Sequence, residues 1–292
     1  MLECSEVGKI LDGNQILDKI SLKVRRGSIF GLVGPNGAGK TSLIKIITGI
    51  WEQDSGFVTV NGAKVFDNPD TKRIIGYVPD LCCYYDSFKV KEILELYRLA
   101  YRAFNEHRFA ELNGGFGISL SQRIRTLSKG MKAKLMLALN LSIMPQLLIL
   151  DEATSGLDPL GKRKFMEILL EEVAERRTTV VICTHNLGDV EQICDTVAVI
   201  NKGRIKFDGT IDAMKHSLRK LQVVFNNGLP EGVAASPGVL GIQSIGSICH
   251  IVARRGAEEL EEALKASEAV SVEEIGLSLE DIFVYSLGGE NI

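Results

Sequence analysis

The chain has 292 residues and a formal net charge of −3; 45% of its residues are hydrophobic and 24% are charged. These proportions fit a globular protein with one large domain or two smaller ones, and the charge gives no sign of a nucleic-acid-binding surface. The six cysteines lack metal-ligand spacing and no secretory signal precedes them, so we expect reduced thiols in a cytosolic protein. The longest apolar run, residues 135–150, is too short and too interrupted to span a bilayer.

The first third of the chain is organised around a phosphate-binding motif. Residues 1–27 are predicted to form a small β region, and the apolar run at residues 28–33 fits a buried strand. The next residues, Gly34-Pro35-Asn36-Gly37-Ala38-Gly39-Lys40-Thr41, have the pattern G-x-x-x-x-G-K-[ST], and a helix is expected to follow from Ser42. Because the loop lies between a strand and a helix, its N–H groups can surround a polyphosphate. Lys40 can then reach the β- and γ-phosphates, and the Thr41 hydroxyl can bind Mg²⁺. This context favours residues 34–42 as a nucleotide site over a glycine-rich turn without a ligand.

Strands and then helices are predicted for the middle of the chain. Residues 57–62 and 74–80 fit two strands, and the second of them is stopped at Pro79-Asp80. From residue 90 onward, apolar side chains recur every three or four positions, as on one face of a helix. Asn113-Gly114-Gly115 is expected to break this helix, and a second helix is expected from near Ser128 to about residue 143.

Carboxylates follow the next buried strand. The apolar residues 147–150 end in Asp151 and Glu152, which alone could simply mark a strand meeting solvent. Beside a phosphate loop, however, Asp151 is expected to hold Mg²⁺ through water, and Glu152 is expected to orient and deprotonate the attacking water. Asp158-Pro159 begins a helix, and the strand at residues 179–184 ends at His185. With two more strands at residues 195–200 and 204–207, the alternation of strands and helices predicts an α/β fold with a parallel sheet.

Three further motifs resemble those of the ATP-binding cassette (ABC) ATPases. Leu127-Ser128-Lys129-Gly130-Met131 resembles the family signature, which is usually L-S-G-G-Q, and Ser155-Gly156-Leu157-Asp158 resembles its D-loop. His185 lies where the family has its switch histidine. The resemblance covers residues 2–209 and implies a phosphate-loop cassette with a mixed or parallel core sheet. It also implies an N-terminal antiparallel β subdomain and a helical subdomain at about residues 81–145, all within an ATP-binding domain at residues 1–215.

The same resemblance implies how the site residues act. Two cassettes would enclose two ATP molecules head to tail, each ATP touching the phosphate loop of one subunit and the signature of the other. Ser128 and Gly130 would then offer a hydroxyl and a backbone N–H to the γ-phosphate across the dimer, at a helix N-terminus that favours anions. Glu152 would be the general base, His185 would contact both the γ-phosphate and Glu152, and Asp158 would couple the two sites.

Three departures from the family pattern affect these expectations. Asp80 stands where the family usually has Gln; it could still meet Mg²⁺ through water and lie in the loop that senses a membrane partner. No aromatic residue is present at residues 8–15 to stack on adenine. Lys129 replaces a signature glycine and Met131 replaces Gln. Lys129 either adds positive charge near the γ-phosphate of the other subunit or is solvated.

Residues 216–292 are predicted to form a small α+β module. Strands are expected at residues 221–225 and 248–252, and helices at residues 257–267 and from Ser278. The run S-L-E-D-I-F that begins at Ser278 is similar to the C-terminal extension of cassettes that serve drug, antibiotic, lipid or polysaccharide exporters. The alternative is an appendage that stabilises a dimer. His250 is expected to be a packed or exposed strand residue rather than a metal ligand.

The sequence therefore predicts the ATP-hydrolysing subunit of an ABC transporter, with export favoured. Its expected partners are a second cassette, either the same or a different chain, and separate membrane-spanning subunits that dock near Asp80 on residues 80–125; no nucleic acid is expected. Such a subunit would lie on the cytoplasmic face of the cell membrane. Two alternatives are a cassette ATPase that acts on ribosomes or DNA and a regulator that binds ATP without hydrolysing it. The first usually has long coiled-coil insertions or two cassettes, and this sequence has neither a long heptad run nor a second phosphate loop. The second is disfavoured by the intact Glu152, His185 and Ser128.

Overall fold

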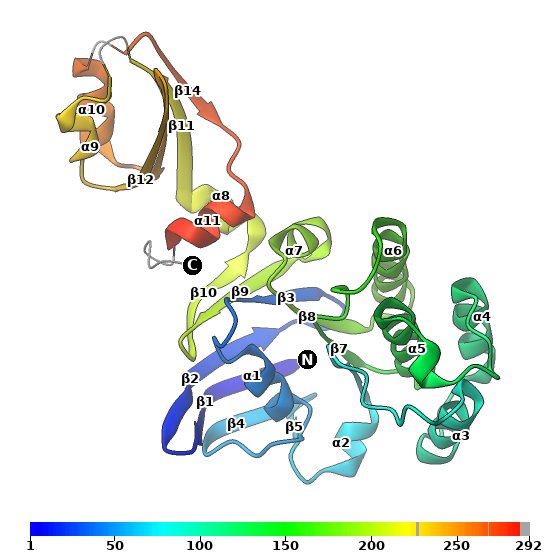
Figure 1. Cartoon of the computed structure of the whole chain (residues 1–292). Coiled ribbons are helices and arrows are strands. Elements are labelled where there is room, and N and C mark those ends of the chain that lie inside the picture. Colours follow the sequence, from blue (N-terminus) through cyan, green and yellow to red (C-terminus); the bar gives the residue numbers. More distant parts are fainter. Residues whose placement is uncertain (226–227, 268, 287–292) are drawn as a thin grey trace. The chain divides into compact units, whose positions relative to one another are not determined.

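The computed structural model describes residues 1–225, 228–267 and 269–286. The chain forms two compact units, Met1–Asp208 and Gly209–Ile292 (Figure 1). The first unit has two β-sheets and two hydrophobic cores, and the second unit has one sheet and a core of its own.

A six-stranded sheet forms the centre of the first unit, in the order β10-β9-β3-β8-β7-β6. Five of its strands pair in parallel, from β9 through β3, β8 and β7 to β6. Every residue of β3, β7 and β8 is buried, as expected for continuous apolar runs in a parallel sheet that is covered on both faces. The strands are β3 (Ile29–Val33), β6 (Ile75–Val78), β7 (Leu147–Asp151), β8 (Thr179–Thr184), β9 (Thr196–Asn201) and β10 (Arg204–Thr210).

An antiparallel sheet in the order β2-β1-β4-β5 forms the N-terminal part of this unit. Strand β1 lies between two partners, with Leu2 opposite Val24 of β2 and Val60 of β4. Its buried side chains share one core with helix α1 and one face of the central sheet. The elements are β1 (Leu2–Leu11), β2 (Asn14–Val24), α1 (Lys40–Ile47), β4 (Ser55–Val60), β5 (Ala63–Lys64) and α2 (Pro69–Arg73).

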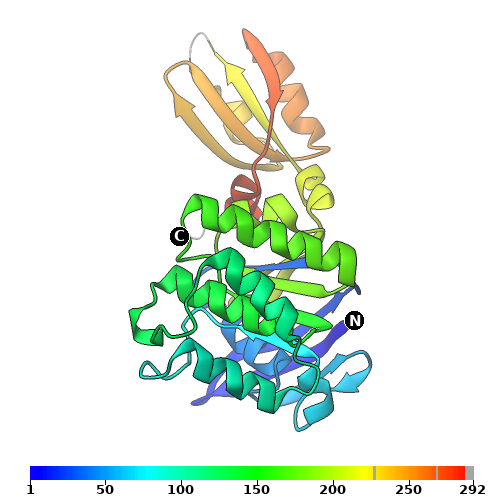
Figure 2. The same cartoon turned by 90° about the vertical axis from the view of Figure 1, so that its right-hand side faces the viewer.

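Helices α3 to α6 pack against the other face of the central sheet and form the second core of the unit (Figure 2). Capping side chains fix where three of them begin: Asn105 accepts from the N–H of Arg108, Ser128 from Met131 and Asp158 from Gly161. The elements are α3 (Val90–Ala100), α4 (Glu106–Phe116), the 3₁₀ helix η1 (Ile124–Thr126), α5 (Lys129–Ser142), α6 (Pro159–Arg176) and α7 (Leu187–Ile193). No helix in the described ranges is both long and apolar enough to cross a bilayer.

The predicted helix break at Asn113-Gly114-Gly115 is wrong, because α4 runs through these residues and ends at Gly117. Each glycine inside a helix costs about 1 kcal/mol relative to alanine. Phe109 and Leu112 of α4 are buried in the core beneath it, and this packing outweighs the weak local preference. The chain instead leaves its helical path before Asn105, between α3 and α4.

The second unit is an antiparallel sheet in the order β12-β13-β11-β14. Helices α9 and α10 contribute to its core, in which Leu260 and Leu264 pack with Leu221 and Ile251. The strands and the amphipathic helix predicted here are present, and β12 and β14 are additional. Helix α11 begins after Ser278, whose hydroxyl accepts the N–H of residue 281 at 3.0 Å. The elements are α8 (Ile211–Ser217), β11 (Leu218–Val224), α9 (Glu231–Ala234), β12 (Val239–Ile245), β13 (Ile248–Arg254), α10 (Glu258–Ala266), β14 (Ser271–Ile275) and α11 (Leu279–Ser286).

Candidate active site

The phosphate loop, residues 34–41, connects β3 to α1 at the C-terminal edge of the central sheet. Gly37 and Gly39 have φ angles of +78° and +104°, which residues other than glycine rarely adopt. A Cβ on Gly34 would overlap the carbonyl oxygen of Ile200, whereas a Cβ on Gly37 would meet no atom within 4 Å. The loop thus packs tightly against β9 on one side and is open on the other, as a phosphate cradle requires.

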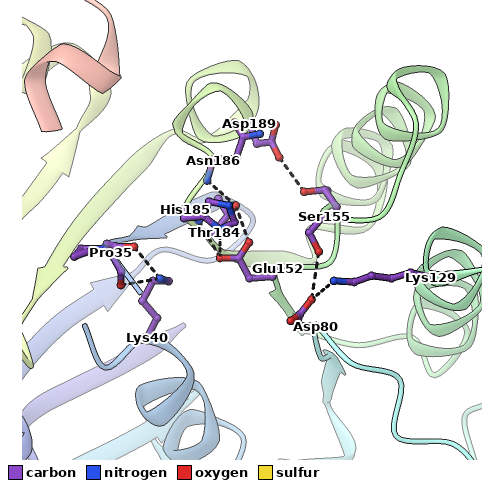
Figure 3. A network of polar contacts seen from close by, with 12 residues as sticks. Pro35, Lys40, Asp80, Lys129, Glu152, Ser155, Thr184, His185, Asn186 and Asp189 are labelled. Carbon is purple, nitrogen blue, oxygen red and sulfur yellow. Dashed lines mark hydrogen bonds and ion pairs between the residues drawn. The ribbon is translucent and has the colours of Figure 1, made fainter. Parts of the chain in front are cut away.

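A cavity of about 410 Å³ lies at the mouth of this loop. Lys40, of which only 7% is exposed, donates to the carbonyl oxygens of Gly34 at 2.8 Å and Pro35 at 3.1 Å, so its ammonium group lies across the loop (Figure 3). The structure brings most of the predicted phosphate and metal residues to this one cavity. Its lining consists of Ile16, Asn36, Gly37, Gly39, Lys40, Thr41, Ser42, Asp80, Asp151 and Glu152.

Asp151 is a buried carboxylate with spare capacity to bind a cation. It ends β7, only 3% of it is exposed, and its Oδ1 has no hydrogen-bond partner. Burial raises the pKa of Asp151, while hydrogen bonds from the Cys183 and Thr41 side chains act in the opposite direction. An orphaned carboxylate oxygen beside a threonine hydroxyl suits the oxygen ligands that Mg²⁺ prefers. Within the described residues no group of three or more His, Cys, Asp or Glu side chains could hold a metal.

Glu152 and His185 lie together, as predicted. His185 Nδ1 is 2.8 Å from Glu152 Oε1, and the backbone N–H of His185 donates to the same oxygen at 3.0 Å (Figure 3). The Thr184 hydroxyl donates to Oε2 at 3.4 Å. Glu152 has a φ angle of +52° and donates its own N–H to the carbonyl of Cys183, so the turn after β7 directs its carboxylate toward the end of β8. Three donors therefore fix the carboxylate beside the phosphate loop.

Asp80, two residues after β6, is held by two partners from distant segments. Lys129 Nζ is 2.7 Å from Asp80 Oδ1, and the Ser155 hydroxyl donates to the same oxygen at 3.2 Å (Figure 3). Lys129 therefore forms an ion pair within its own chain, an arrangement that differs from both expectations for it, charge near the γ-phosphate of the other subunit or a solvated side chain. Neither the pair nor Ser155 was predicted, since no local pattern links these segments.

Comparison with known proteins places the chain in a family. The family model for ABC transporters matches residues 17–155. YtrB of Bacillus subtilis strain 168, an ABC transporter ATP-binding protein, is 29% identical over 99% of both chains. DrrA of Streptomyces peucetius, a daunorubicin/doxorubicin resistance ATP-binding protein, is 33% identical over 74% of this chain and 67% of its own length. The solved structure of an ATP-binding subunit of an ABC transporter is 32% identical and superposes with a TM-score of 0.68, over 73% of this chain and 91% of that one.

This chain belongs to the ABC transporter ATP-binding proteins. The predicted family, the cassette fold and ATP hydrolysis are thereby confirmed. Solved ABC cassettes of 21% identity, with TM-scores of 0.66, show the same fold.

The signature and D-loop of this ABC ATPase lie next to each other but outside the lining of the phosphate cavity. Ser128 is the N-cap of α5, and its hydroxyl accepts the N–H of Met131 at 3.2 Å. A Cβ on Gly130 would overlap the carbonyl oxygen of Gly156, so the two segments are in close contact. The Asp158 side chain caps α6 by accepting the N–H of residue 161 at 3.2 Å. Ser128, Gly130 and Asp158 therefore do not line the phosphate cavity of their own chain, whereas Lys129 and Ser155 reach its rim through Asp80.

An aliphatic residue lies at the mouth of the phosphate cavity. Ile16, at the start of β2, lines the phosphate cavity, and no ring does so. Ile16 lies one residue beyond the stretch 8–15 that lacks an aromatic residue. An apolar side chain near the start of β2 is the sequence feature that corresponds to this position.

Proposed function

We propose that this ABC ATPase energises export of a small molecule through separate membrane-spanning subunits on the cytoplasmic face of the cell membrane. One observation carries the proposal: its 33% identity to DrrA, a drug-resistance ATP-binding protein. The run from Ser278 to Phe283, which resembles the C-terminal extension of exporter cassettes, supports it. In this proposal residues 1–215 are the ATP-binding domain and residues 216–292 an accessory module.

The cavity residues carry the proposed hydrolytic step. Lys40, Thr41 and Ser42 bind the phosphates, and Thr41, Asp151 and Asp80 hold Mg²⁺, directly or through water. The metal supplies charge neutralisation at the β- and γ-phosphates. Glu152, oriented by His185, accepts a proton from the attacking water. The Nδ1 contact to Glu152 leaves His185 Nε2 free to face the γ-phosphate.

A second cassette completes each site in this proposal. Ser128, Gly130 and the N-terminus of α5 lie outside the cavity of their own chain, so a partner copy must present them to the nucleotide. Lys129 is directed toward Asp80 of its own chain. The γ-phosphate bound by one subunit then meets the positive end of α5 of the other subunit. Hydrolysis of ATP removes the γ-phosphate that joins the two subunits.

The segment after Asp80 offers an apolar surface for a membrane-spanning partner. Leu81, Tyr85 and Leu99 are exposed by 70%, 72% and 76%. Tyr85 packs on Phe88, with ring centroids 5.2 Å apart, so part of this surface is preordered. Leu81 and Tyr85 lie between β6 and α3, and Leu99 lies on α3; large exposed apolar side chains are typical of protein contact sites. We place the docking surface on residues 80–125, next to the magnesium-facing Asp80.

The proposal is tested by co-purification from solubilised cells, with the Glu152→Gln chain loaded with ATP as the bait. A multi-spanning membrane protein in equal amount is the expected result. The matched control, Glu152→Gln with Leu81→Asp and Tyr85→Asp, should still bind ATP and lose this partner. Recovery of ribosomes or DNA-bound proteins without a membrane protein would instead favour a cassette that acts on nucleic-acid assemblies.

A further inference from the structure

Three segments of the cassette converge on one carboxylate oxygen. Lys129, in the first turn of α5, and Ser155, in the loop after β7, both contact Asp80 Oδ1, at 2.7 and 3.2 Å (Figure 3). These partners are 49 and 75 residues away from Asp80 along the chain. Neither contact uses Oδ2, although Asp80 itself lines the phosphate cavity.

The direction of the Lys129 side chain is fixed by packing as well as by charge. A Cβ on Gly156 would lie 2.7 Å from Cγ and 3.0 Å from Cβ of Lys129, so the lysine stem lies directly on the Gly156 backbone. A residue larger than glycine at position 156 would push the stem away. The ammonium group is thereby aimed at Asp80 of the same subunit.

We infer that Lys129 is a positioning residue, which holds the Asp80 carboxylate at the rim of the ATP cavity of its own subunit. With Oδ1 occupied by Lys129 and Ser155, Oδ2 is left to accept a hydrogen bond from a magnesium-bound water. This inference rests on the proposed role of Asp80 at Mg²⁺. It gives the family departures at positions 80 and 129 one shared explanation: the shorter acidic side chain is used together with a lysine that orients it.

The direction in which replacing Lys129 changes Mg²⁺ binding distinguishes a positioning role from a through-space effect of its charge. Asp80 and Lys129 have half-exposed side chains, so without the contact the carboxylate would rotate among several rotamers and Mg²⁺ would bind less well. The positive charge of Lys129 by itself repels Mg²⁺. Removing that charge would therefore improve Mg²⁺ binding if the lysine acted through space alone.

The test is Mg²⁺-dependent binding of a fluorescent ATP analogue to the full chain carrying Glu152→Gln. Adding Lys129→Met should raise the Mg²⁺ concentration for half-maximal binding about two- to fivefold, the range of an exposed ion pair. Ser155→Ala, which changes no charge, should shift it in the same direction, and Lys129→Arg should stay within about twofold of the parent. Lys132→Met is the matched control. Lys132 lies on the same helix as Lys129, pairs with Asp86 at 3.4 Å and does not line the cavity, so its replacement should leave the Mg²⁺ midpoint unchanged.

The Asp80→Asn chain separates the two proposals. If Asp80→Asn leaves the Mg²⁺ midpoint unchanged, the proposed role of Asp80 fails. If Asp80→Asn shifts the midpoint and Lys129→Met does not, or shifts it downward, the positioning role of Lys129 fails. The expected result is that Lys129→Met has no further effect in the Asp80→Asn chain. An equal effect in both backgrounds would show that Lys129 acts elsewhere, such as on the nucleotide of the partner subunit.

Discussion

Replacing Asp151 with asparagine is expected to stabilise the nucleotide-free chain while abolishing its activity. The Asp151 carboxylate is buried, its Oδ1 has no partner, and burial raises its pKa. A buried charge with unmet hydrogen-bonding capacity costs more than an amide of the same shape. Because the amide also leaves one group unsatisfied, we expect a gain of only about 1 kcal/mol in the free energy of unfolding. For a unit of this size, that corresponds to about 2–4 °C in Tm.

The pH dependence of this gain has a definite sign. An acid with a raised pKa binds its proton more tightly in the folded than in the unfolded chain. The stability penalty of Asp151 is therefore absent below its ordinary pKa of about 3.9, grows as the pH rises from there to the raised pKa of the folded chain, and is complete above it. The Tm advantage of Asp151→Asn should accordingly be full at neutral pH and shrink as the pH falls toward 4.

The assay is calorimetric unfolding with and without ATP and Mg²⁺, together with phosphate release. Ligand at 100 times its Kd stabilises a folded protein by about 2.7 kcal/mol; the parent chain should show this gain and Asp151→Asn should lose most of it. Asp86→Asn, at an exposed carboxylate outside the cavity, is the control and should change neither quantity. A nucleotide-free Asp151→Asn chain that melts below the parent at pH 7 would refute burial as the dominant influence on Asp151.

Three further predictions concern the general base, its histidine and a buried ion pair. Glu152→Gln should retain ATP binding and lower turnover about 10²–10⁴-fold, as for a positioned base; turnover at the parent rate would contradict the role. His185→Ala should lower turnover with little change in Tm, because the histidine side chain is mostly exposed; an equally large Tm loss would indicate a structural role instead. Arg108→Met leaves the buried Glu172 without its α4 partner and should cost about 3 kcal/mol in urea unfolding. Arg98→Met, at an exposed ion pair, should cost much less than Arg108→Met, and equal costs would contradict burial as the cause.

The sequence by itself determined the chemistry at the ends of the parallel strands. The phosphate loop, the pair Asp151 and Glu152, and His185 each follow a buried apolar run, and parallel strands bring their carboxyl ends to one edge of the sheet. The helix starts at Ser128 and Asp158 could also be predicted from the sequence, because a cap is a contact between residues three apart. Such features depend on the spacing of residues that are close in the sequence, so the sequence alone predicts them.

Only the tertiary structure decided the contacts between distant segments. The Asp80 carboxylate meets Lys129 and Ser155 because β6, α5 and the loop after β7 are brought together by packing, and no local pattern records that meeting. The same cause lets α4 continue through Gly114 and Gly115, and places Ile16 at the nucleotide cavity. Burial of one face against a core is worth more than the local preference of a few residues, so these features follow from the fold as a whole.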